Sequence, residues 1–82
     1  MTDLRSPTYR RFLILLKRAR IDAELHQREA AAMLGLPQSF VAKCELGRRR
    51  VDALELAAFA TVYNKPMTYF IPSVTRLEDL LK

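Results

Sequence analysis

Apolar residues recur along this chain at intervals of three and four, which predicts short helices. In residues 7–20, Phe12 and Leu16 belong to such a stripe, which would be buried on one face of a helix. Ser6 and Pro7 precede it: a serine side chain caps a helix start, and proline in the first turn costs no intrahelical hydrogen bond. No segment alternates apolar and polar residues as a half-buried strand would.

The clearest pattern lies in residues 27–46. An alanine-rich run over residues 27–34 stops at Gly35, and a second short run begins after about three residues. Glycine suits that turn because it adopts positive φ at little cost. Ala31 is small enough to let two helices approach, and Val41, ten residues later, would fill the space between them. Two helices joined in this way form a helix-turn-helix, whose second helix enters the DNA major groove.

The rest of the chain also reads as helices. Asp52 and Glu55 have the spacing of an acidic capping box, and Pro66 begins another short run. Thr75 and Glu78 repeat the capping-box spacing near the end. The predicted helices cover residues 7–20, 27–34, 37–46, 52–63 and 66–71, with a further turn or two over residues 75–81.

Composition narrows the possible functions. The chain has 82 residues, enough for one domain, and half are hydrophobic, so a core can form without disulfides or metal. Fourteen Lys and Arg oppose nine Asp and Glu, and the net charge of +5 favours a polyanionic partner. Cys44 is the only cysteine, which suits a reducing cytoplasm. No signal-peptide-like stretch or run of about 18 apolar residues is present, so we expect a cytoplasmic protein without membrane contact.

The helix-turn-helix spacing resembles that of the lambda-repressor and Cro-type (xenobiotic-response-element-like) family. The likeness extends over residues 12–70 and includes Leu25-x-Gln27, Glu45-x-Gly47 and Phe59-Ala60. It implies an all-α, lambda-repressor-like fold: a compact bundle of five short helices with a central helix-turn-helix. On this interpretation residues 1–72 form the DNA-binding domain. Residues 73–82 form a short helical tail and a possible dimerisation segment.

The resemblance also implies roles for individual residues. Gln27 would hold a phosphate, while Gln38 and Ser39 would reach base edges. The chemistry agrees, because a glutamine amide can bond bidentately to adenine and serine is a less selective partner. Lys43 lies one turn beyond Ser39 on the same face and could reach a guanine or a phosphate. Phe40 has two possible places: in the groove against a thymine methyl, or in the core.

Basic and structural residues surround this helix. We interpret Arg48, Arg49 and Arg50 as a phosphate clamp rather than a merely solvated loop, with Arg28 as a further contact. Val41 and Cys44 should pack inward, Cys44 as a small core residue rather than a reactive thiol. The resemblance further implies that Arg20 pairs with Glu45 and ties the first helix to the third.

Three positions depart from the family pattern. Glu24 stands where glycine commonly ends the first helix, so either it adopts a left-handed conformation or that helix runs on. His26 replaces the usual Ser or Thr cap before Gln27, and Ala30 replaces a larger apolar residue. None of these departures removes the helix-turn-helix pattern.

The sequence therefore predicts a sequence-specific regulator of transcription, a repressor, that binds double-stranded DNA as a homodimer on a palindromic operator. The alternative is an antitoxin or protein-interaction module that binds a partner protein and its own operator. An enzyme is poorly supported, and no cofactor or metal site is expected. The candidate dimer interface is apolar and includes Met67, Tyr69, Phe70, Ile71, Val74, Leu77, Leu80 and Leu81.

Overall fold

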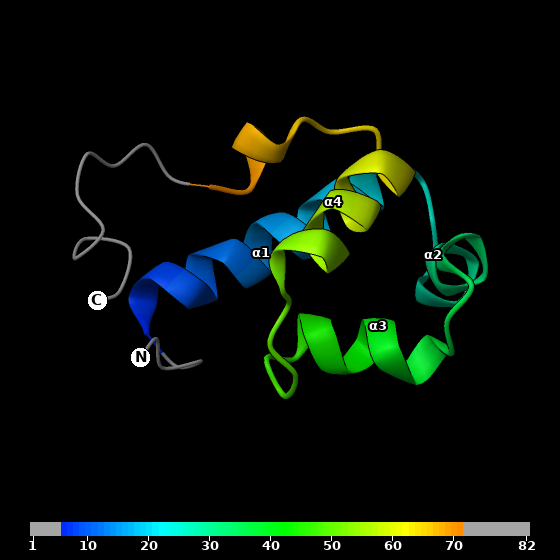
Figure 1. The fold of residues 1–82 in the computed structure, drawn as a ribbon, viewed down its shortest axis with the longest axis horizontal. Coiled ribbons are helices and arrows are strands. Elements are labelled where there is room, and N and C mark those ends of the chain that lie inside the picture. The colour runs from blue at the N-terminus through cyan, green and yellow to red at the C-terminus, as the bar shows by residue number, and fades with distance from the viewer. Residues whose placement is uncertain (1–5, 72–82) are drawn as a thin grey trace.

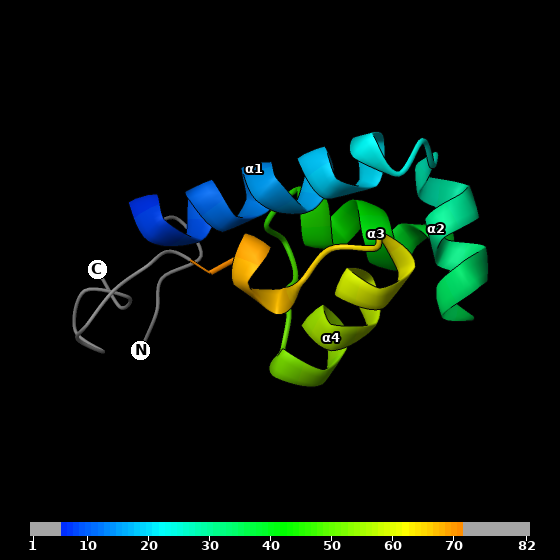
Figure 2. The ribbon, with the colours of Figure 1, turned by 90° about the horizontal axis from the view of Figure 1, so that it is seen from above.

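The computed structural model describes residues 6–71, and this part of the chain is helical with no strand. Its elements are α1 (Pro7–Asp22), α2 (Gln27–Leu34), α3 (Gln38–Glu45), α4 (Ala53–Val62) and a 3-10 turn, η1 (Met67–Tyr69). Helix α1 runs behind α4, and α3 lies below both (Figure 1). Seen from above, η1 lies between α1 and α4 (Figure 2). The prediction of an all-α fold is confirmed for these residues.

Helix α1 begins as the sequence predicts and ends two residues later than expected. The Ser6 side chain accepts a hydrogen bond from the backbone N–H of Tyr9 at 3.1 Å. The helix continues to Asp22, and Glu24 then adopts a left-handed conformation with φ 59°. Both alternatives considered for Glu24 therefore occur together.

Helices α2 and α3 are separated by the predicted glycine turn. Gly35 follows α2 with φ 71°, and its N–H donates to the carbonyl of Ala32. The His26 side chain makes no capping hydrogen bond, in line with the weakened cap. Instead, the Glu29 carboxylate accepts from the His26 backbone N–H at 2.8 Å, so half of a capping box holds this helix start.

The C-terminal part of the described chain differs from the prediction. Asp52 and Glu55 form the expected capping box, with the Asp52 carboxylate accepting from the Glu55 N–H at 2.7 Å. A short helix begins after Pro66 as predicted, but it is the 3-10 turn η1 and is shorter than the expected range 66–71. The sequence between Pro66 and Pro72 is too short for a stable α-helix. The predicted turn over residues 75–81, like the tail over 73–82, lies outside the described residues.

The core forms where the four helices meet. Val41 and Cys44 are fully buried on the inner side of α3, in agreement with the prediction. Ala30 and Ala31 of α2 are also buried, and their small side chains let the neighbouring helices approach closely. Burial raises the pKa of the Cys44 thiol, which keeps it protonated and suits a core residue. The other buried apolar residues are Leu16, Ala19, Leu56, Phe59, Ala60, Tyr63 and Phe70.

Candidate nucleic-acid interface

Helix α3 has an apolar inner face and a polar outer face. Val41 and Cys44 fix the inner face in the core. The three polar residues predicted to contact bases, Gln38, Ser39 and Lys43, are all exposed. They occur at helical spacing, so they lie together on the side that faces away from the core. This helix therefore presents an amide, a hydroxyl and an ammonium group to solvent along one surface.

An ion pair fixes the orientation of α3 relative to α1. Arg20 Nε donates to Glu45 Oε2 at 2.7 Å, and Nη2 donates to Oε1 at 3.1 Å. Both side chains are at least nine-tenths buried, and Glu45 hydrogen bonding raises the pKa of Arg20. The third contact of Arg20 is to the Leu25 carbonyl at 2.8 Å, in the turn between α1 and α2. One guanidinium thus connects α1, the turn before α2, and α3.

Gln27 joins the same network. Its Nε2 donates to Glu45 Oε1 at 3.1 Å, a contact that was not predicted from the sequence. This bond ties the first residue of α2 to the last residue of α3 and orients the Gln27 amide. Arg28 is exposed next to it. The side of the molecule between the starts of α2 and α3 is hollowed, and its lining comprises Arg20, His26, Gln27, Arg28 and Gln38.

Phe40 packs against the core. Its ring stacks on Phe59 of α4, with ring centroids 6.1 Å apart and an interplanar angle of 12°. The side chain is half-buried. Of the two places left open by the sequence, the structure therefore shows the inner one, and the predicted thymine contact of Phe40 has no support from its position.

The three arginines after α3 have different surroundings. Arg48 is exposed. Arg49 pairs with Glu55, with Nη1 and Nη2 each 2.8 Å from a carboxylate oxygen, and its guanidinium lies 4.5 Å above the Phe40 ring. Arg50 lies 5.8 Å from the ring centre of Tyr9. The three arginines were expected to act together as one phosphate clamp, but within this loop they have different contacts.

Two side chains that hold this loop were missed by the sequence-based prediction. The Tyr9 hydroxyl of α1 accepts from the Val51 N–H at 3.1 Å, and Glu55 receives Arg49 in addition to capping α4. Tyr9 is 42 positions from Val51, so no local pattern could reveal that contact. The capping-box spacing identified Glu55, but it gave no information about a partner across the loop.

Other kinds of site find no support in residues 6–71. This region brings no three His, Cys, Asp or Glu side chains together as a metal ion would require. Its longest helix, α1, like the others there, is too short or too polar to cross a membrane.

Two short helices joined by a glycine turn, the second with a buried inner face and polar side chains on its outer face, have the arrangement of a helix-turn-helix. The family model described as helix-turn-helix matches residues 16–70. The chain belongs to this family, of the lambda-repressor and Cro type. No curated protein matches the chain in sequence. Family membership makes it a DNA-binding regulator of transcription.

Proposed function

We propose that this protein is a repressor that reads a palindromic operator as a homodimer, with α3 in the major groove. The observation that carries the proposal is the exposure of Gln38, Ser39 and Lys43 on the outer face of a helix whose inner face is buried. These side chains would contact base edges, as a glutamine amide does with adenine and a lysine with guanine.

Phosphate contacts would flank the recognition helix on both sides. Gln27 and Arg28 lie at the start of α2, where backbone N–H groups and the helix dipole also favour an anion. Arg48 and Arg50 lie just beyond the end of α3. Each neutralised phosphate adds about 0.9 to the dependence of log affinity on log salt, so these contacts have a measurable signature. Arg49 differs from them in that its guanidinium pairs with Glu55.

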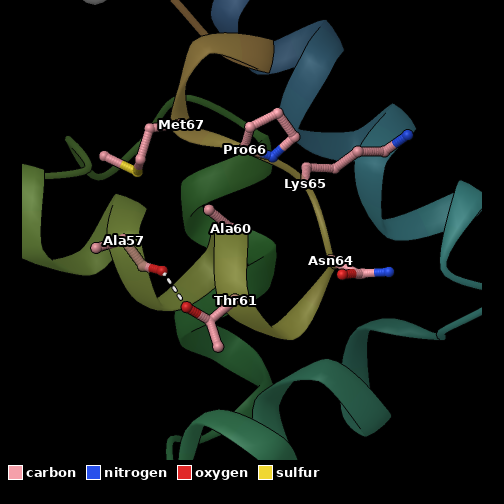
Figure 3. A pocket seen from close by; sticks show the side chains of 7 residues that line it. All are labelled: Ala57, Ala60, Thr61, Asn64, Lys65, Pro66 and Met67. Atoms are coloured by element: carbon pink, nitrogen blue, oxygen red, sulfur yellow. Dashed lines mark hydrogen bonds between the residues drawn. The ribbon is translucent and has the colours of Figure 1, made fainter.

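A homodimer is supported by the exposed face of α4, which carries no charge. Leu54 on this face is 83% exposed. Next to it, Ala57 and Thr61 line a groove, whose other lining residues are Ala60, Asn64, Lys65, Pro66 and Met67 (Figure 3). The Thr61 hydroxyl donates to the Ala57 carbonyl at 2.9 Å. A projecting leucine and a groove on one face suit a two-fold contact, in which each copy receives the other's side chain.

This surface refines the interface predicted from the sequence. Phe70 is fully buried in the core, and Tyr69 packs at the core edge, so neither is available as a main contact. Met67 and Ile71 remain partly exposed beside α4. Leu54 was not among the predicted interface residues, because helical spacing alone does not distinguish this exposed leucine from a buried one.

The direct test is selection of bound sites from a random duplex pool at about 150 mM salt, which suppresses non-specific phosphate binding. Enrichment of a palindrome with half-sites about 10 base pairs apart would support a dimeric operator reader. Binding that simply fades as salt rises, with no enrichment, would contradict sequence-specific recognition. The alternative of a protein-interaction module would then become the leading one.

The dimer is tested separately by sedimentation equilibrium of the wild type and of Leu54→Glu. The substitution should shift the molecular mass towards that of a monomer, because a charge would be buried in the interface. Ile14→Glu is a matched control, since Ile14 is 66% exposed on α1. A wild-type chain that is monomeric at tens of micromolar, or an unchanged mass for Leu54→Glu, would contradict this interface.

A further inference from the structure

The guanidinium of Arg49 is held by three groups of this chain. Its two terminal nitrogens each lie 2.8 Å from one oxygen of Glu55, a two-point geometry that gives arginine–carboxylate pairs their specificity. Nη1 also donates to the Arg50 carbonyl at 3.1 Å. The planar group covers the Phe40 ring at 4.5 Å, a distance at which the cation and the ring attract each other.

The groups that hold Arg49 are themselves fixed. Glu55 Oε1 accepts from the Asp52 N–H at 3.0 Å as part of the α4 capping box, so the carboxylate cannot swing away without breaking the cap. Phe40 is stacked on Phe59, which is 1% exposed. Arg49 therefore closes a layered contact that runs from α4 through the Phe40 ring to the guanidinium.

From these contacts we infer that Arg49 positions the recognition helix, by clamping Phe40 against α4, instead of neutralising a phosphate. Phe40 directly follows Gln38 and Ser39 in the first turn of α3. Holding its ring fixes the rotation of that turn about the helix axis. The rotation decides where an exposed side chain meets a base edge, because a misplaced donor loses its hydrogen bond steeply with angle. The inference rests on the proposed function, since it names a residue that tunes base reading.

Two substitutions with opposite charge changes separate positioning from phosphate contact. Arg49→Gln removes a positive charge, and Glu55→Gln removes a negative one; both break the same fork. If Arg49 positions α3, both should weaken binding to a duplex enriched in the selection above, by about 5- to 20-fold. If Arg49 contacts a phosphate and Glu55 merely competes for it, Glu55→Gln should instead strengthen binding.

A random-sequence duplex of 24 base pairs provides the second measurement. Arg49→Gln should leave the salt slope on this duplex near the wild-type value. Arg48→Gln, the matched control one residue earlier, should lower it by about 0.9 for each subunit bound. Positioning lowers affinity for the selected duplex alone, whereas general destabilisation would lower both affinities together. Arg49→Lys keeps the charge and loses the two-point geometry, so it should not restore selected-duplex affinity.

The positioning role of Arg49 can be tested even if the selection enriches no duplex. Amide hydrogen exchange of the free protein should then be faster in the first turn of α3 for Arg49→Gln and Arg49→Lys, at a temperature where circular dichroism shows both folded. Unchanged exchange would overturn the positioning role. So would a salt slope reduced by about 0.9 for Arg49→Gln, a gain in affinity for Glu55→Gln, or full rescue by lysine. Failure of the enrichment alone would count against the operator proposal only.

Discussion

Arg20 and Glu45 are 25 positions apart and meet through two hydrogen bonds of 2.7 and 3.1 Å between α1 and α3. The resemblance to lambda-repressor and Cro-type proteins implied this pairing, and the structure contains it. Gln27 also donates to Glu45. The carboxylate therefore links α1, the start of α2 and the end of α3.

Arg20→Ala should lower stability and DNA affinity together, because Glu45 would remain buried without its main counter-charge. The free energy of unfolding should fall by about 2–4 kcal/mol in urea denaturation. Gln38→Ala is the matched comparison: Gln38 is exposed, so its loss should change stability by less than about 0.5 kcal/mol while affinity falls. Equal losses of stability for the two variants would contradict this division of roles.

The two glycines offer a matched pair of backbone tests. Gly35 and Gly47 both have positive φ, at 71° and 77°, so alanine at either should cost about 1–2 kcal/mol. A Cβ on Gly35 would meet open space, whereas one on Gly47 would lie 2.9 Å from Leu13 Cδ1. The Leu13 side chain would have to move aside to make room for this Cβ. Because that movement has a small cost of its own, Gly47→Ala should lower the free energy of unfolding by about 0.5–1 kcal/mol more than Gly35→Ala. In a Leu13→Ala background, urea denaturation should show that this difference disappears; its persistence would point to backbone strain alone.

Tyr63→Phe should either leave the free energy of unfolding unchanged or raise it, by up to about 1 kcal/mol. The Tyr63 hydroxyl is buried and has no hydrogen-bond partner within residues 6–71, so its removal relieves an unsatisfied group. Tyr69→Phe is the comparison, because Tyr69 is only half-buried. A clear loss of stability in Tyr63→Phe alone would show that the hydroxyl has a partner in solution, such as a water molecule.

Tyr63 should also make the free energy of unfolding depend on pH in the alkaline range. Burial raises the pKa of the Tyr63 phenol above its usual range. The folded state then favours the neutral phenol. The contribution of Tyr63 to stability is therefore fully present below the unfolded pKa of about 10, and it declines as the pH rises further. Tyr63→Phe should lose less stability between about pH 10 and 11 in urea titrations than the wild type does. Equal declines would assign the alkaline loss to other groups.

Glu55 should make the free energy of unfolding depend on pH in the acid range. Hydrogen bonds from Arg49 and from the Asp52 N–H lower the pKa of this carboxyl. A lowered folded pKa gives stability that is present above the unfolded pKa and lost as the pH falls through the folded value. The wild type should therefore lose stability below about pH 4.5 more steeply than Glu55→Gln does. Because the pair is partly exposed, the difference should shrink in 0.5 M salt. If the wild type and Glu55→Gln lost stability equally at acid pH in low salt, that result would contradict the contribution of Glu55.

Much of the architecture was determined by short-range features of the sequence. Ser6, Asp52 and Glu55 cap helices through hydrogen bonds to backbone groups three residues away, so their spacing alone is informative. Gly35 ends α2 because positive φ is cheap only for glycine. The burial of Val41 and Cys44 followed from helical spacing. The limit of such reasoning appears at residues 66–71, where a favourable start did not lead to an α-helix.

What only the tertiary structure decided was which distant groups meet. The sequence left Phe40 between the groove and the core, and the choice depended on Phe59 of α4 lying opposite it. It grouped Arg49 with two neighbouring arginines and did not show that Glu55, across the loop, pairs with Arg49. Capping and turn preferences act within a few bonds of the backbone, so a sequence displays them. Contacts between helices depend on how those helices cross, which is set by the packing of the whole core.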